Sequence, residues 1–172
     1  MKHLSGSELK KLMVHVPSKW KLLVLVSFWH GLRASEATQL TGNSIRDGYV
    51  QVPRLKGSKE TNQPYVFHAD PELSEGEGLL ELAKTVKGSE RLFPIGRQHF
   101  WTIMQNSCKQ AGIPHIFAHP HVLKHSLAMA LHEKGKPVEE IQKILGHARI
   151  TSTMVYVQVS EQQALKGVGA CI

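Results

Sequence analysis

The 172-residue sequence lacks the features of a membrane protein and of a disulfide-bonded secreted protein. No apolar run approaches the roughly 18 residues that a bilayer span requires, and the run at 22–29 has only the length of a buried helix. The N-terminus does not have the organisation of a signal peptide. The two cysteines, Cys108 and Cys171, form no CxxC motif and no disulfide framework. We therefore expect a soluble protein of a reducing cytoplasm.

Motifs for nucleotide-driven and metal-dependent chemistry are equally scarce. The sequence contains no P-loop and no carboxylate cluster that would hold two magnesium ions. The zinc-type HxxxH spacing occurs at His121–His125, but without the glutamate of HExxH. His115 and His119 precede it in a loop, and no cysteine or aspartate accompanies them. A zinc-dependent hydrolase is therefore an alternative that rests on this histidine cluster alone.

Negative charge concentrates in one segment. The chain has a formal net charge of +7, and the segments before and after the acidic stretch 70–90 are predominantly basic. A basic surface interrupted by an acidic segment suggests one face for a polyanion and another that faces away from it. Basic charge is also common in proteins that bind no nucleic acid. We expect the acidic stretch to be a solvated face.

Hydrophobic periodicity predicts one domain, at 1–172, of the α+β class and mainly α. Between 47 and 70 the sequence alternates β-formers around a KGSK turn, which predicts an antiparallel hairpin or a small three-stranded sheet inserted among helices. Pro53 and Pro64 should confine these strands to sheet edges, because proline cannot donate a ladder hydrogen bond. Caps, glycine stops and apolar spacing predict helices at 7–16, 20–30, 34–40, 79–86, 96–112, 120–134, 138–145 and 152–159.

Several side chains have a purely structural interpretation. His30 precedes a Gly-Leu-Arg turn and is expected to buttress Arg33. Large apolar residues at helical spacings are expected in the core, namely Trp20, Phe28, Trp29, Phe100, Trp101 and Met104.

The first turn of the helix expected at 120–134 combines a cation with titratable side chains. His121 and Lys124 are three residues apart and share one face, with His125 on the flank. A helix N-terminus already favours an anion through its free N–H groups and its dipole. The sequence therefore predicts a phosphate-binding site here, while capping and surface positions are the alternative for each single histidine.

Two further stretches carry residue types suited to phosphate chemistry. HGLRASE places Arg33 directly after a helix stop, with Glu36 three residues later. LGHARITSTMVYV places His147 after a helix, with Tyr156 nine residues further on. Each alone is compatible with a surface arginine, a helix cap or a packed tyrosine. Their order, with a hairpin lysine and the H-x-L-K-H stretch between them, resembles the tyrosine recombinase (phage integrase) family.

The resemblance covers essentially the whole chain and implies the helical catalytic domain of that family. Lys56, in LKGSKE, corresponds to the family's hairpin lysine, and Lys59 is a weaker candidate for the same role. The family's separate N-terminal core-binding domain is not expected in this chain, so we expect weak, salt-sensitive and poorly sequence-specific DNA binding. The resemblance implies Glu36 and His125 as supporting residues and a catalytic set of Arg33, Lys56, His121, Lys124, His147 and Tyr156.

The sequence departs from the family pattern at Lys124, where the family has an arginine. Lysine keeps the charge but loses the planar fork that binds two phosphate oxygens, although it can still contact a phosphate as a point charge. An attenuated recombinase or a non-catalytic DNA-binding protein derived from one is therefore an alternative. A helix-turn-helix regulator could use the short turn at 135–137, but Glu139 and Glu140 would be unfavourable in a DNA groove.

The residue types suit transfer of a phosphodiester to a tyrosine. A tyrosine with a pKa near 10 must lose its proton to attack, and nearby cations lower that cost and stabilise the pentavalent transition state. Arg33 and Lys124 would hold the non-bridging oxygens, and His147 would donate a further hydrogen bond. We expect His121 to accept the tyrosine proton and Lys56 to protonate the departing 5′ oxygen.

The resemblance also implies the reaction and its partners. It implies a site-specific DNA recombinase or integrase that forms a covalent 3′-phosphotyrosine and requires no ATP, metal or other cofactor. The implied partners are double-stranded DNA and further recombinase protomers, with a tetramer on DNA and a monomer in free solution. The tail at 160–172 would contribute to that assembly. The implied location is the cytoplasm of a bacterial, archaeal or phage-infected cell, on DNA and without a membrane partner.

Overall fold

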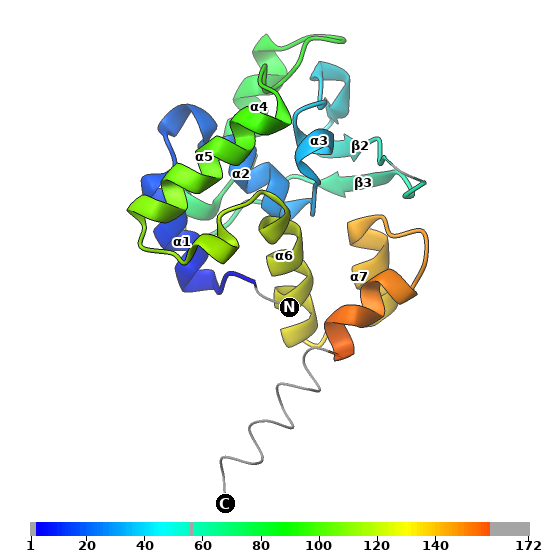
Figure 1. Ribbon diagram of the computed structural model, residues 1–172. Helices are drawn as coiled ribbons and strands as arrows, with labels where there is room; N and C mark the ends of the chain where they lie inside the picture. The colour runs from blue at the N-terminus through cyan, green and yellow to red at the C-terminus, as the bar shows by residue number, and fades with distance from the viewer. Residues whose placement is uncertain (1–2, 56, 159–172) are drawn as a thin grey trace, which may run out of the picture.

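The computed structural model describes residues 3–55 and 57–158 and shows a helical protein with one small sheet at its side (Figure 1). This arrangement confirms the mainly helical α+β prediction. Residues 151–158 are also helical. The α-helices are α1 (Gly6–His15), α2 (Ser18–Trp29), α3 (Ala34–Ala37), α4 (Gly76–Thr85), α5 (Arg97–Gln110), α6 (His121–Glu133) and α7 (Val138–Leu145). Short 3-10 turns are η1 (Gly42–Ser44), η2 (Pro71–Leu73) and η3 (His115–Phe117).

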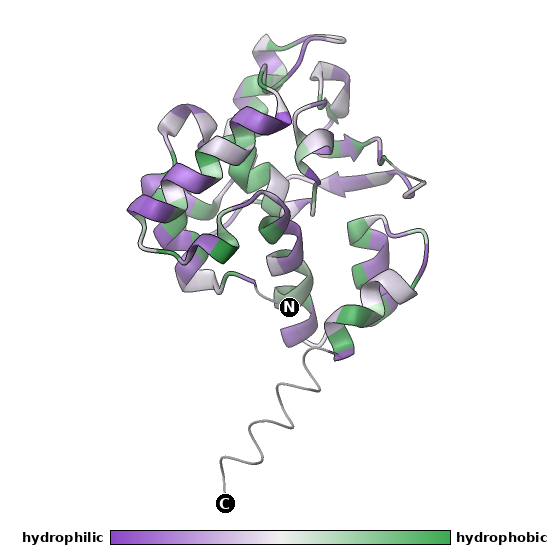
Figure 2. Ribbon diagram, in the orientation of Figure 1, coloured by the Kyte–Doolittle hydropathy of each residue, from purple (hydrophilic) through white to green (hydrophobic). Residues whose placement is uncertain are grey.

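The core is organised around α2, whose residues 23–28 are all buried. A helix that is apolar on every side must be surrounded, and α2 packs against α6 on one side. The outer helix α1 packs against α5. Figure 2 shows that outer helices such as α5, unlike a fully buried helix, carry both polar and apolar residues. Within the described residues, no helix is both long and apolar enough to span a bilayer.

The sheet is antiparallel, with strand order β1–β2–β3. Its strands are β1 (Ile45–Arg46), β2 (Tyr49–Val52) and β3 (Thr61–Pro64). Asp47 and Gly48 connect β1 to β2 with φ values of 52° and 81°, which suits a tight hairpin whose turn residues are both left-handed. The edge position predicted from Pro64 is confirmed, but the one predicted from Pro53 is wrong because β2 is central. Pro53 is tolerated because it follows the last paired residue, Val52.

The chain from α6 onward brings the LGH segment to the β3 edge of the sheet. Gly135, at φ 74°, ends the α6 segment, and α7 then packs against β3. Gly146 follows α7 in the left-handed region at φ 66°. A Cβ there would lie 2.7 Å from the Lys59 carbonyl oxygen and 2.8 Å from Arg54 Nε, so only glycine fits both the backbone angle and the space. This close approach places His147 beside the loop that joins β2 to β3.

The structure corrects three structural expectations. Trp101 is 42% exposed rather than part of the core. The acidic stretch is not simply a solvated face, because Asp70 binds Lys10 at 2.6 Å and Glu75 is fully buried. Glu75 Oε1 lies 2.6 Å from Nε2 of His30, so the side chain of His30 pairs with this carboxylate instead of buttressing Arg33.

Candidate active site

Arg33 is held in place by an acid three residues further along. It is the N-cap residue of α3 and has extended backbone angles, so it lies just before the first turn of the helix. Its backbone N–H donates to Glu36 Oε2 at 2.8 Å, and its guanidinium donates to Oε1 at 2.7 Å. The guanidinium also donates to Ser58 Oγ at 3.2 Å. Glu36 is buried, whereas the Arg33 side chain keeps 26% exposure, so Arg33 is oriented yet accessible.

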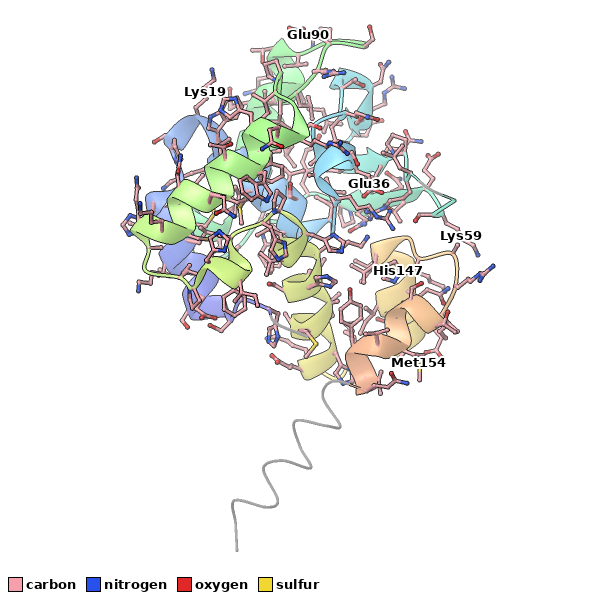
Figure 3. All side chains as sticks on the ribbon, viewed as in Figure 1. Lys19, Glu36, Lys59, Glu90, His147 and Met154 are labelled. Carbon is pink, nitrogen blue, oxygen red and sulfur yellow. The ribbon has the colours of Figure 1, made fainter. Side chains whose placement is uncertain are left out.

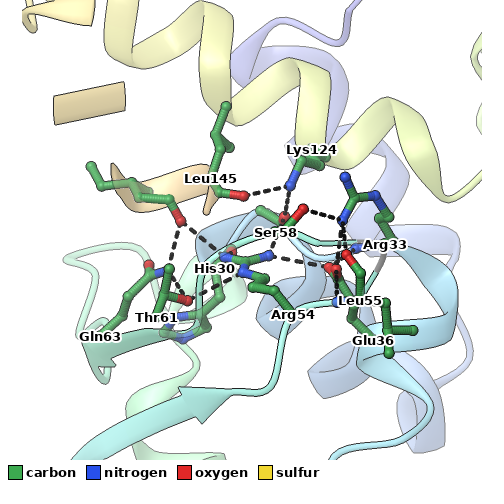
Figure 4. Close-up of polar contacts among 12 residues, drawn as sticks. His30, Arg33, Glu36, Arg54, Leu55, Ser58, Thr61, Gln63, Lys124 and Leu145 are labelled. Atoms are coloured by element: carbon green, nitrogen blue, oxygen red, sulfur yellow. Dashed lines mark hydrogen bonds and ion pairs between the residues drawn. The ribbon is translucent and has the colours of Figure 1, made fainter. Parts of the chain in front are cut away.

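Arg54, which the sequence analysis did not select, forms the centre of a buried polar layer (Figure 4). Its side chain is fully buried and donates to the Gly31, His30 and Ile144 carbonyls at 2.8–2.9 Å and to Glu36 Oε2 at 3.2 Å. It thereby joins the end of α2, helix α3 and helix α7. Burial lowers the pKa of Arg54, and the Glu36 carboxylate opposes that shift.

The same buried layer holds the pKa of Glu36 below its usual range. Burial acts to raise this pKa, but the hydrogen bonds from Arg33 and the charge of Arg54 outweigh it. A sequence signal for Arg54 was available. Val50 and Val52 are the inward positions of β2, and the same alternation makes 54 the next inward position.

Lys124 belongs to this buried layer and not to the open face where we expected it. It is 1% exposed, and its Nζ donates to the carbonyl oxygens of Gly31 at 2.9 Å and Leu145 at 2.8 Å. Burial, aided by the positive charge of Arg54, lowers the pKa of Lys124 to about 7. We expected His121 and Lys124 to share one open face of the helix. The structure corrects this, because His121 is exposed and Lys124 points into the protein. The ammonium of Lys124 thus bridges the end of α2 and the end of α7, and shares the Gly31 carbonyl with Arg54.

Tyr156 is buried at 3% exposure and shares a hydrogen bond with a histidine of α6. Its hydroxyl lies 2.9 Å from Nδ1 of His125, and burial raises its pKa to about 12. We expected His121 to be the proton acceptor, but the imidazole that bonds the hydroxyl here is His125. His121 stands behind it, with ring centroids 4.4 Å apart in an edge-to-face contact.

The pKa values of the three site histidines are all lowered in this state. Burial lowers the pKa of His125 and of His147 to about 4, and the neighbouring positive charges add to the effect. The pKa of His121 is lowered too, first by desolvation and then by Lys124. At neutral pH His125 and His147 are therefore uncharged imidazoles.

His147 is fixed by the helix that follows it. It is 8% exposed, and its Nδ1 lies 2.9 Å from Oγ1 of Thr153, which is fully buried. If the threonine hydroxyl donates to Nδ1, the ring proton resides on Nε2, which is the tautomer that can donate to a ligand. Figure 3 shows His147 on the same side of the molecule as Glu36 and Lys59.

An open cavity of about 470 Å³ joins two of the predicted residues. Arg33 and His147 both line it, and so do Ser58, Arg149 and Ser152, which the sequence analysis did not select. Lys59 lines a neighbouring cavity of about 360 Å³ between β3 and α7, which His147 also borders. The predicted Lys56 lies outside the described residues.

Metal ligands do not gather in the part of the chain that the structure describes. There, no three histidine, cysteine, aspartate or glutamate side chains are grouped as a metal site would need. Instead, His125 contacts the Tyr156 hydroxyl, and His121 packs edge-to-face against His125. The zinc alternative therefore has no geometric support among these residues.

The fold and this site together define the class of integrase-type catalytic domains, in which helices and an inserted antiparallel sheet bring arginine, histidine and tyrosine motifs together. A sequence model described as the phage integrase family matches residues 2–163. The chain belongs to this family.

Curated relatives and solved structures agree with the assignment. Tyrosine recombinase XerD of Bifidobacterium longum is 35% identical over 160 residues, covering 85% of this chain and 51% of the relative. Tyrosine recombinase XerC of Herpetosiphon aurantiacus is 32% identical over 157 residues, covering 85% and 50%. The chain thus spans about half the length of these relatives.

Among solved structures, the catalytic domain of bacteriophage HP1 integrase has a TM-score of 0.70 at 22% identity. The match covers 92% of this chain and 88% of that domain. The XerH site-specific recombinase, solved in a post-cleavage complex with its palindromic difH substrate, has a TM-score of 0.71 at 22% identity. That match covers 97% of this chain and 52% of XerH. At these identities the likeness shows the fold.

Proposed function

We propose that this chain is the catalytic domain of a tyrosine-type site-specific DNA recombinase or integrase. The observation that carries the proposal is the cavity in which Arg33 and His147, from distant parts of the sequence, stand beside the helical residues 151–158 that hold Tyr156. Relatives named tyrosine recombinases support it. Double-stranded DNA is the proposed substrate, with assembly of several protomers on it and a DNA-associated location in the cytoplasm.

The proposed reaction is a transesterification. Arg33 binds a non-bridging oxygen of the scissile phosphodiester, and His147 donates a hydrogen bond from Nε2. The Tyr156 oxygen bonds to phosphorus while the bond from phosphorus to the 5′ oxygen breaks. The tyrosine proton passes to a nearby imidazole, and Lys56 supplies a proton to the departing 5′ oxygen. The resulting 3′-phosphotyrosine keeps the bond energy, so a 5′-hydroxyl of another strand can reverse the step without ATP or metal.

Two further residues, Glu36 and Lys124, are proposed to support the catalytic residues without contacting the substrate. Glu36 fixes the direction of Arg33 through two hydrogen bonds, and Lys124 adds partial positive charge from the buried layer. Tyr156 must also change its environment, because a buried hydroxyl with a pKa of about 12 is a weak nucleophile. We propose that DNA binding shifts residues 151–158 and breaks the contact with His125.

Residues 1–172 are proposed to act as one catalytic unit. The curated relatives extend well beyond the matched half, and we propose that tight, sequence-specific DNA binding needs those further parts. The chain by itself should bind DNA weakly and with strong salt dependence.

Covalent capture tests the function. The protein is incubated in EDTA, at low salt, with duplexes of randomised sequence that carry a nick a few bases to the 3′ side of each test position. The short fragment released by cleavage then diffuses away and traps the intermediate. We expect a denaturant-resistant protein–DNA adduct that Tyr156→Phe abolishes. An adduct that persists in Tyr156→Phe, or that forms only without EDTA, would contradict the mechanism.

A non-catalytic or attenuated DNA-binding protein is the second candidate. It is favoured by the burial of Lys124. This residue stands where the family has an arginine, and its Nζ is directed toward the Gly31 and Leu145 carbonyls. Salt-sensitive DNA binding without an adduct from the whole pool would support this candidate over the recombinase.

A further inference from the structure

Among the described residues, the basic groups already assigned to the chemistry at the cavity of Arg33 and His147 are paired, uncharged or directed elsewhere. A pentavalent phosphorane carries one more negative charge than the diester, so its non-bridging oxygens need firm electrostatic support. Arg33 is already ion-paired with Glu36 at 2.7 Å. His147 has a pKa of about 4, so it enters the reaction uncharged. Lys124 directs its Nζ at two carbonyls.

Arg149 is a further basic residue at this cavity. It lines the same cavity of about 470 Å³ as Arg33, Ser58 and His147. It is exposed, and within residues 3–55 and 57–158 no ion pair or side-chain hydrogen bond holds its guanidinium. Its charge is therefore uncommitted, in contrast to the paired guanidiniums of Arg33 and Arg54.

The backbone around Arg149 is anchored by hydrogen bonds on both sides. Gly146 ends α7 in the left-handed conformation, and the His147 N–H donates to the Gln142 carbonyl at 3.1 Å. The Arg149 carbonyl accepts from the Ser152 N–H at 3.2 Å at the start of the next helical segment. A side chain that leaves such a fixed loop can reach the cavity without a large loss of backbone entropy.

We infer that Arg149 is the second phosphate-binding arginine of this site, contacting a non-bridging oxygen of the scissile phosphodiester across the cavity from Arg33. It supplies the planar, permanently charged fork that position 124 does not present to the cavity. This inference rests on the proposed function. It concerns the scissile phosphate, as distinct from the flanking phosphates that any basic surface residue can contact.

The test measures single-turnover adduct formation at saturating DNA, using the duplex recovered from the random pool. The variants are Arg149→Ala and Arg149→Lys, with Arg97→Ala as a control, because Arg97 is an exposed arginine at the start of α5 outside this cavity. We expect Arg149→Ala to slow the step about 10²- to 10³-fold, as for loss of one transition-state donor. Arg149→Lys should recover part of the rate, and Arg97→Ala should leave it unchanged.

A second substrate distinguishes the two kinds of phosphate contact. A methylphosphonate at the cleavage position replaces one charged non-bridging oxygen by a methyl group and leaves every flanking phosphate intact. If Arg149 neutralises the scissile phosphate, the rate penalty of Arg149→Ala should shrink at least about tenfold on this substrate. An equal penalty on both substrates, or a loss confined to DNA affinity, would overturn the inference.

The outcomes also distinguish a failure of the Arg149 inference from a failure of the proposed recombinase function. If the unmodified protein forms no adduct, the recombinase proposal fails and the inference fails with it. If the unmodified protein forms an adduct and Arg149→Ala forms it at the same rate, the function stands and only the inference is wrong. A thermal midpoint unchanged in Arg149→Ala would show that any rate loss is not a folding defect.

Discussion

The buried layer around Arg54 and the open cavity around Arg33 lie next to each other, share Glu36, and use positive charge in opposite ways. In the layer, Arg54 and Lys124 donate to carbonyl oxygens at the end of α2 and in α7, and Arg54 also binds the Glu36 carboxylate of α3. In the cavity, Arg33 is ion-paired with Glu36 but remains partly exposed, and Arg149 is exposed, so both guanidiniums are accessible to a ligand. The comparison teaches that a basic residue in a motif can serve either region, and that burial decides which.

The largest expected effect is loss of the layer's central cation. Arg54→Ala removes the partner that balances the buried Glu36 carboxylate and leaves several buried carbonyls without a donor. We expect the free energy of unfolding to fall by about 3–5 kcal/mol, as when one partner of a buried ion pair is removed. Urea denaturation measures this. Arg46→Ala, at an exposed position in β1, is the control and should change stability by less than about 0.5 kcal/mol. A loss as small as the control's would show that the layer does not hold these helices together.

An intermediate effect is expected from restoring the family pattern at position 124. Lys124→Arg forces a larger, planar group into a site that is 1% exposed and shaped for an ammonium. We expect a loss of about 1–3 kcal/mol in unfolding free energy from overpacking, with no gain in adduct rate. Lys143→Arg, on the exposed side of α7, is the matched control. A faster adduct rate in Lys124→Arg would instead mean that the lysine is a weakened phosphate clamp.

The effect that is smallest at neutral pH is an acid dependence of the stability, which comes in part from His125. The folded pKa of His125 is about 4, below the ordinary 6.5, so the unfolded chain binds the proton more tightly. Stability should therefore be complete above pH 6.5 and fall as the pH drops toward 4. One such group contributes a slope of up to about 1.4 kcal/mol per pH unit.

His125→Asn tests this dependence, because asparagine keeps an acceptor for the Tyr156 hydroxyl but does not titrate. Urea denaturation across the acid range should show a shallower slope in the variant, while the part due to His147 remains. An unchanged slope would mean that folding does not lower the pKa of His125.

Local sequence signals were sufficient for much of the fold. The helix α7 was predicted at its observed bounds, because acidic residues in its first turn, Lys143 in its last and Gly146 after it all mark helix ends. The hairpin was predicted from alternation. Proline placement at the sheet was only half predictable, because the edge rule concerns paired residues and Pro53 lies just beyond them.

The candidate site was predictable in its motifs but not in its contacts. Arg33 and His147 do meet at one cavity, although 114 positions separate them in the sequence. His121 was predicted to accept the Tyr156 proton, which stays a prediction, and the imidazole that lies next to the hydroxyl in the structure is His125. Helical spacing places both on neighbouring parts of α6, and only the approach of residues 151–158 selects between them.

The sequence by itself determined the mainly helical fold with its inserted sheet, the family, and the order in which arginine, histidine and tyrosine motifs occur. These follow from local propensity, periodicity and motif spacing, which act over a few residues at a time. The tertiary structure alone decided which groups Arg54 and Lys124 bind, that Tyr156 is buried against His125, and that Arg149 lines the same cavity as Arg33. The physical reason is that desolvation and hydrogen-bond partners depend on which distant segments close over a side chain.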